Sequence, residues 1–271
     1  MKKTNVLVLV MFFFLATGCA STHKYSEDGR LFSYDENFKI IINTTNKGEI
    51  IQHYGIPTST DTVGKYQILT YKHSQESFKA KGINPLTFIP VVGLAVTAVE
   101  ISSNEDHTKN IRDWELMVIY TDLMTGVVKD YYYNDSKFRG HDESERLFIV
   151  AQKQLVDGKT DEALQLLEKS VSLNSRNHRA LNALAWQLID QGIDLDKGVE
   201  YAQQAVSVFP DSPYNNGTLG VGYLKKGDAV NAEKYLQTAV DLFPTYAPTD
   251  NKGLQYDKAM LQHAREQKKN S

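Results

Sequence analysis

The distribution of apolar and polar residues divides the chain into four parts. An apolar run over Val6 to Leu15 is followed by a polar stretch, Ala20 to Asn37, which has neither a helical nor a strand period. From residue 38 to 133, short aromatic and aliphatic runs alternate with turn residues, as is typical of strands. From residue 143 onwards, apolar and small residues recur at helical spacing. The pattern predicts an α+β region followed by an all-α region.

One helix and three strands are expected in the first region. Asn46 is a suitable N-cap with Glu49 three residues later, and Gly55 and Pro57 end the helix. The strand-like runs are residues 65–72, 114–121 and 127–133. Gly126 supplies the positive backbone angle that a short loop between the last two runs requires. The pattern therefore predicts one short helix and three strands, the last two joined as a hairpin.

Four segments of this region, residues 38–133, resemble the BamE-like (SmpA/OmlA) domain of small outer-membrane lipoproteins. They are Thr45 to Ile50, Tyr54 to Pro57, Tyr66 to Tyr71, and Val118 to Val128 with its Gly126. The resemblance implies an α+β domain, with a helical layer on an antiparallel three-stranded sheet. It also implies that the domain helps to build or stabilise the outer-membrane envelope by binding protein or lipid. It implies no catalytic activity.

A long insertion separates the first two expected strands. Ile83 to Val99 carries no charged residue, and Pro85, Pro90 and Gly93 interrupt any helix in it. The segment either folds over the sheet of its own domain or contacts a membrane or a partner protein, and a transmembrane helix is the least favoured reading. The contact residues in the second case would be Phe88, Ile89, Val91 and Leu94.

Beyond a polar linker, residues 134–142, the chain repeats itself with a period near 34 residues. Pro244 lies 34 residues after Pro210, and an earlier, weaker copy is in phase. The clearest copy contains Leu219, Gly220, Tyr223, Gly227, Ala232, Leu236, Ala239 and Pro244. A glycine recurs in each copy where a first helix would end. The spacing predicts helix pairs that pack through small residues.

These copies resemble tetratricopeptide (TPR) repeats. The resemblance implies an α-solenoid over residues 143–271, with three helix pairs and a seventh, capping helix over residues 254–267. It also implies a concave face that binds protein. The partner-binding places are Phe148, Arg179, Asn182, Trp186, Tyr214 and Val221. A packed core position for Trp186 and a merely solvated position for Arg179 and Asn182 remain as alternatives.

The first eighteen residues have the parts of a secretory signal. Lys2 and Lys3 precede the apolar run, and Ala16 to Gly18 are small. Cys19, the one cysteine of the chain, follows directly. The apolar run is too short to span a bilayer comfortably, so an N-terminal membrane span is the less favoured alternative. A signal peptide over residues 1–18 is therefore expected.

Leu15 to Cys19 resembles the lipobox of bacterial lipoproteins, with Ala16 where a larger aliphatic residue is usual. The resemblance implies that Cys19 becomes the N-terminus and carries a diacylglycerol and an N-acyl chain such as palmitate. Residues 19–37 would then be the lipidated cysteine and a flexible tether. Ala20, rather than an aspartate, follows the cysteine, which in this family implies anchoring to the outer membrane, facing the periplasm.

The net charge and the motifs of the sequence argue against nucleic-acid binding and against catalysis. The chain has 30 basic and 33 acidic residues, and loss of Lys2 and Lys3 with the leader would change its net charge from −3 to −5. A mildly acidic protein offers no electrostatic surface for nucleic acid. The seven histidines are scattered, and the sequence contains no His-Glu-x-x-His, no phosphate-binding glycine loop and no Gly-x-Ser-x-Gly. We expect no enzymatic activity and no cofactor apart from the lipid.

Two hypotheses follow. The preferred one is a non-enzymatic envelope lipoprotein that acts as a protein–protein interaction scaffold, with envelope proteins as partners. The alternative is an accessory lipoprotein that recruits a cell-wall or secretion enzyme to the outer membrane.

Overall fold

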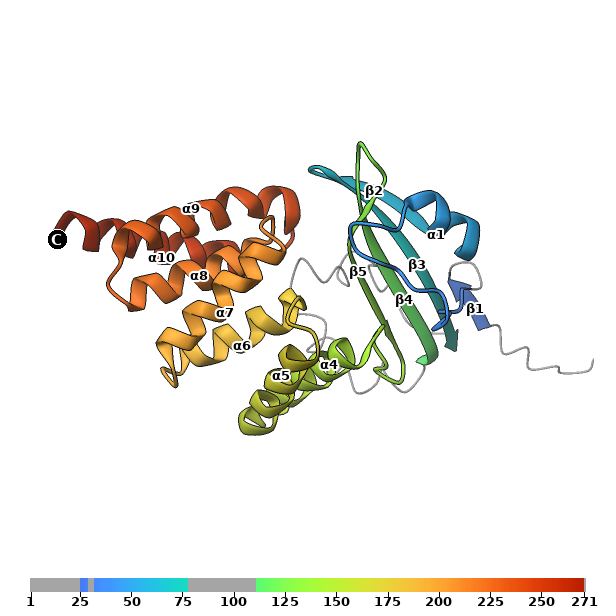
Figure 1. The fold of residues 1–271 in the computed structure, drawn as a ribbon, viewed down its shortest axis with the longest axis horizontal. Coiled ribbons are helices and arrows are strands. Elements are labelled where there is room, and N and C mark those ends of the chain that lie inside the picture. Colours follow the sequence, from blue (N-terminus) through green and yellow to red (C-terminus); the bar gives the residue numbers. More distant parts are fainter. Residues whose placement is uncertain (1–24, 29–31, 78–110, 271) are drawn as a thin grey trace, which may run out of the picture.

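The computed structural model describes residues 25–28, 32–77 and 111–270, which form a sheet domain followed by a stack of helices (Figure 1). The strands are β1 (Tyr25–Asp28), β2 (Ser59–Val63), β3 (Tyr66–Ser77), β4 (Ile111–Asp122) and β5 (Val128–Asp135). All pairings are antiparallel, in the order β1-β3-β4-β5, and β2 also pairs with β3. The three predicted strands are confirmed as β3, β4 and β5, but the predicted three-stranded sheet is wrong, because β1 and β2 also pair with β3.

The predicted helix before the sheet is confirmed as α1 (Lys47–Tyr54). The side chain of Asn46 caps it by accepting a hydrogen bond from the backbone N–H of Gly48, at 2.9 Å. Gly55 ends the helix with a φ of 80°, a conformation that residues with a Cβ rarely adopt. Ile50 is fully buried and fixes α1 against the sheet.

Both faces of the sheet are buried. Because successive side chains of a strand point to opposite faces, Met117 and Ile119 pack towards α1, whereas Val118 and Tyr120 pack on the other side with residues of the helical stack. Figure 1 shows α1 on one side of the sheet and the helices that follow it on the other. The helical stack therefore completes the core of the sheet domain.

The first domain begins earlier than expected. β1 pairs with the end of β3 (Tyr25 opposite Ser77), and Phe32 is buried against Tyr54 and Tyr71. The flexible tether predicted for residues 19–37 is therefore wrong for Tyr25–Asp28 and from Phe32 onwards. The segment is polar overall, but a few aromatic residues in it fill the space between α1 and the sheet.

The predicted linker over residues 134–142 is also an ordered part of the fold. Asp135 belongs to β5, and its buried carboxylate accepts hydrogen bonds from the backbone N–H groups of Lys137 and Arg139. It also binds the guanidinium of Arg139. The segment is polar because these side chains build the turn.

Seven helices follow. They are α4 (Glu143–Val156), α5 (Thr160–Leu173), α6 (His178–Asp190), α7 (Leu195–Val208), α8 (Pro213–Lys225), α9 (Ala229–Tyr246) and α10 (Asn251–Asn270). They form three pairs and a final helix, as predicted, and the turn glycines Gly158, Gly192 and Gly227 all have positive φ angles. Pro244 lies inside the last turn of α9 rather than after it.

Small residues set the spacing of the pairs. A Cβ added to Gly220 of α8 would lie 2.6 Å from Cγ of Leu236 in α9, and Ala232 of α9 has no exposed surface. The two helices can approach this closely because Gly220 has no side chain, so that Leu236 packs directly against the backbone of α8. The packing predicted from the repeat pattern is confirmed here.

Candidate functional site

A stack of three rings joins the two domains. Phe209, between α7 and α8, stacks on Tyr66 of β3 with ring centroids 5.6 Å apart. Its other face lies on the imidazole of His178 in α6, with centroids 4.9 Å apart. The hydroxyl of Tyr66 donates a hydrogen bond to Asp211, which also pairs with Lys65 at 2.7 Å.

A buried charge cluster lies beside this stack. Asp130 of β5 accepts hydrogen bonds from Arg179 Nη2, at 2.5 Å, and from His178 Nε2, at 3.2 Å. The same guanidinium donates to the backbone carbonyl of Tyr131 and lies 3.8 Å from Glu145 of α4. The other imidazole nitrogen of His178 faces the amide of Asn215, at 3.5 Å.

Asp130 and Arg179 stabilise each other's ionised forms. Burial alone would raise the pKa of Asp130, but Arg179 and His178 hold that pKa below its usual range. Burial would likewise lower the pKa of Arg179, whereas Asp130 and Glu145 raise it. The carboxylate of Asp130 is therefore ionised and bound by Arg179 and His178, which is typical of a structural residue rather than a general base.

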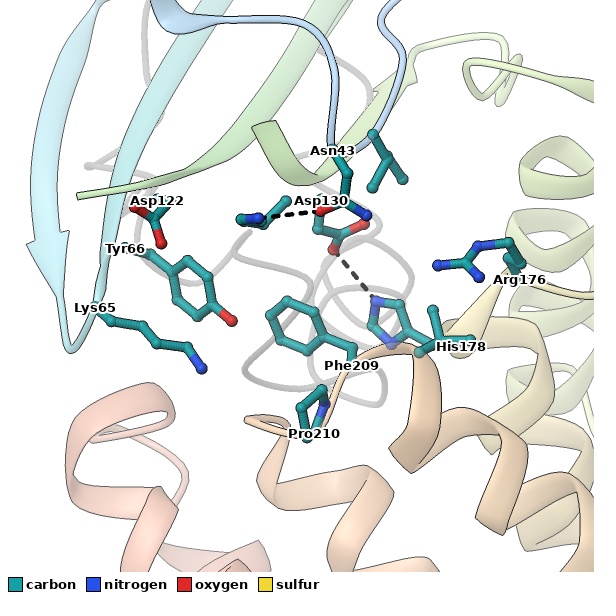
Figure 2. A pocket seen from close by; sticks show the side chains of 12 residues that line it. Asn43, Lys65, Tyr66, Asp122, Asp130, Arg176, His178, Phe209 and Pro210 are labelled. Carbon is teal, nitrogen blue, oxygen red and sulfur yellow. Dashed lines mark hydrogen bonds and ion pairs between the residues drawn. The ribbon is translucent and has the colours of Figure 1, made fainter. Parts of the chain in front are cut away.

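A pocket of about 320 Å³ opens at this interface (Figure 2). Its polar lining residues are Asn43, Lys65, Tyr66, Asp122, Lys129, Asp130, Arg176 and His178. Figure 2 shows Lys65 and Arg176 at opposite ends, with Asp130 and His178 between them. Lys65 is paired with Asp211 and Asp130 with Arg179, whereas Lys129 binds the neutral side chain of Asn43, which does not offset its charge.

A second surface is the inner face of the stack. We use this name for the side that the first helices of the pairs (α4, α6 and α8) and α10 turn away from α5, α7 and α9. Trp186 of α6 is half-buried there and meets the ring of Tyr256 in α10 edge-to-face, at 5.8 Å. Asn182, one turn earlier, is 6% exposed, and its Oδ1 has no hydrogen-bond partner among the described residues.

The structure gives the other predicted partner residues different surroundings. Arg179 is 3% exposed and bound by Asp130, so it holds the backbone of β5 rather than that of a partner. Phe148 and Val221 are buried in the cores of the stack, and Tyr214 donates a hydrogen bond to Asp250 and packs on Phe243. These residues were chosen by their position in the repeat alone. That position does not reveal that the sheet and the final helix cover them. Cys19 and the segment Ile83 to Val99 lie outside the described residues.

Sequence reasoning missed the interdomain residues Asp130, His178 and Phe209. One signal was available, because the strands Leu116 to Tyr120 and Tyr131 to Tyr133 lack the polar alternation of a sheet with one solvated face. Such runs indicate burial on both sides. The partner for the second face could not be read from them.

No family model matches the chain, and no curated protein matches it. Similar solved structures include the type III secretion translocator chaperone SycD of Yersinia enterocolitica, with 20% identity, a TM-score of 0.42, and coverage of 47% of this chain and 95% of that one. PcrH from Pseudomonas aeruginosa has 19% identity and a TM-score of 0.40, over 45% of this chain and 91% of that one. The Sgt2 TPR domain from Aspergillus fumigatus has 20% identity and a TM-score of 0.38, over 46% and 82%. These scores are below 0.5, and no functional conclusion follows from them.

The described part of the chain contains neither a candidate metal site nor a candidate membrane-spanning helix. No group of three or more histidine, cysteine, aspartate or glutamate side chains there could hold a metal ion. None of its helices combines the length and the apolar character that crossing a membrane requires.

Proposed function

We propose that this chain is a non-enzymatic, lipid-anchored adaptor of the bacterial envelope, whose helical stack binds a segment of another envelope protein on its inner face. The observation that carries the proposal is the pairing of a half-buried aromatic residue with an unsatisfied polar atom. Trp186 and the Oδ1 of Asn182 lie one helical turn apart on that face. Aromatic residues dominate binding energies, and a buried acceptor without a partner gains free energy when a ligand supplies a donor.

The sheet domain supports this role by holding the stack in place. Its second face is buried against Phe209 and Tyr246, and Arg179 is tied to β5. Under the proposal, the BamE-like resemblance of this domain reflects a docking role in the envelope through its remaining surface. The membrane-facing role of Ile83 to Val99 stays a prediction.

The anchor is the second part of the proposal. Lipidation of Cys19 would attach the adaptor to the outer membrane, facing the periplasm, as the lipobox resemblance of Leu15 to Cys19 implies. Beyond the lipid, the proposal requires no cofactor.

Site-specific photocrosslinking in cells tests the proposed binding face. A photoreactive residue would replace Asp190, which is exposed at the end of α6 and lies close enough to Tyr256 to raise the pKa of that phenol. The control position is Glu200, exposed on α7 of the same pair. Both replacements remove one negative charge. We expect a discrete protein adduct from position 190 and none from position 200, and equal labelling from the two positions would contradict the proposal.

A further inference from the structure

Asp257 of α10 is buried against a glycine. Its side chain is 6% exposed and lies over Gly217 of α8, where an added Cβ would be 2.5 Å from Oδ2 of the carboxyl group. A glycine inside a helix costs about 1 kcal/mol relative to alanine. The missing side chain at position 217 makes the room that this carboxyl group occupies.

The carboxyl group of Asp257 has no partner among the described residues. No hydrogen bond or ion pair reaches it, and the titratable groups that face it are Asp250, Tyr214 and Tyr256, none of them a cation. Burial, with a smaller contribution from Asp250, raises its pKa to about 7. Its neighbour Asp250 is fully engaged, because it caps α10 and accepts from the hydroxyl of Tyr214.

Asn182 supplies a second unsatisfied acceptor on the same face. It occupies in α6 the repeat position that Gly217 occupies in α8, and those two helices are in contact. Gly217 has no side chain of its own that could satisfy either acceptor, and the carboxyl group of Asp257 lies directly over it. The contact of Trp186 with Tyr256 shows that side chains of α6 and α10 meet across that helix.

The chemistry of these atoms selects the class of ligand. The Oδ1 of Asn182 and the carboxylate of Asp257 are both acceptors, so the complementary group must donate hydrogen bonds, and the carboxylate favours a positive charge. The rings of Trp186 and Tyr256 border the site, and aromatic faces attract organic cations. A hard metal ion would need more oxygen ligands than these two residues provide.

We propose that the inner face between α6, α8 and α10 is a recognition site for an arginine or lysine side chain of a bound protein segment. The proposal rests on the adaptor function and specifies the chemistry of its partner. Entry of the cation would ionise Asp257, so one proton is released to solvent for each protonated carboxyl group that binds. Binding should therefore strengthen as the pH rises from 6 to 8.

A peptide library with one fixed central position tests this site. The full chain in detergent would be incubated with pools that each fix one amino acid within a random background. We expect enrichment of the arginine and lysine pools by the wild type, at least tenfold above the citrulline pool. That preference should be lost with Asp257→Asn, a neutral isostere, and with Gly217→Ala, which fills the space beneath the carboxyl group.

The outcomes separate the two proposals. Retention of other pools without a preference for arginine or lysine would overturn the cation site and leave the adaptor function intact. The same holds if Asp257→Asn keeps the preference of the wild type, provided that circular dichroism shows both to be folded. If no pool is retained above the level of Trp186→Ala, both the site and the peptide-binding inner face are overturned.

Discussion

Arg179, in the first turn of α6, and Asp130, in the middle of β5, form a buried ion pair that joins the helical stack to the sheet. Each side chain is almost completely inaccessible, and each has further partners: His178 for the carboxylate and Glu145 for the guanidinium. Removal of one partner would leave the other in the interior without its closest opposite charge. Such changes typically cost about 3–5 kcal/mol.

Arg179→Met should therefore lower the free energy of unfolding by about 3–5 kcal/mol, measured by urea denaturation. The double variant with Asp130→Asn should lose less than the sum of the single variants, because it removes the carboxylate that Arg179→Met alone deprives of its guanidinium. A loss below about 1 kcal/mol for Arg179→Met would show that the guanidinium is solvated, as one reading of the sequence allowed.

The ring stack predicts a second interdomain effect. Phe209→Ala removes the ring that lies between Tyr66 and His178 and should cost about 3–5 kcal/mol, as for other large core aromatics. Tyr235→Ala is a matched control, since Tyr235 is a partly buried aromatic in the helical stack that does not touch the sheet. Equal, small losses for both variants in thermal unfolding would contradict the interface.

Asp257 predicts an unusual dependence of stability on pH. Its pKa of about 7 in the folded protein lies above the usual aspartate value of 3.8, so the folded state holds this proton more tightly than the unfolded state. The contribution of this group to stability is fully present below pH 4 and declines as the pH rises towards 7, by at most about 1.4 kcal/mol per pH unit. Asp257→Asn should flatten the curve between pH 5 and 8 in chemical denaturation, and an unchanged slope would contradict the assignment.

Lipidation can be tested without reference to the fold. Cys19→Ala should abolish incorporation of a labelled fatty acid and leave the protein unprocessed or free in the periplasm, because the thiol is the proposed acceptor. Cys19→Ser is a closer control for size. Equal labelling of the wild type and both variants would contradict this part of the proposal.

The helical region was predictable because its information is local and repeated. Gly158, Gly192 and Gly227 end the first helices at a regular spacing, and small residues such as Ala232 mark the crossings. Three of the strands were also visible as aromatic and aliphatic runs. The pairing of β1 with β3 was not predictable, because Tyr25 to Asp28 has no distinctive residue pattern and its partner residues are far away in the sequence.

The candidate site was less predictable because it depends on contacts between distant segments. The repeat pattern places Arg179 and Tyr214 on a concave face, but only the structure reveals that Asp130 and Asp250 engage them. The sequence around Asp257 did not indicate a buried carboxyl group, because its burial depends on Gly217 of another helix. Position within a repeat specifies where a side chain points, and long-range packing decides what it meets.

The measurement that tests the central claim most directly is the yield of the partner adduct from a photoreactive residue at position 190 in the Trp186→Ala background. The control background is Tyr223→Ala, which truncates a partly buried aromatic that stacks on Tyr235 of α9. If the inner face binds a partner segment, Trp186→Ala should reduce the yield at least tenfold, and Tyr223→Ala should leave it nearly unchanged at equal protein levels. Equal yields in the two backgrounds would contradict the account.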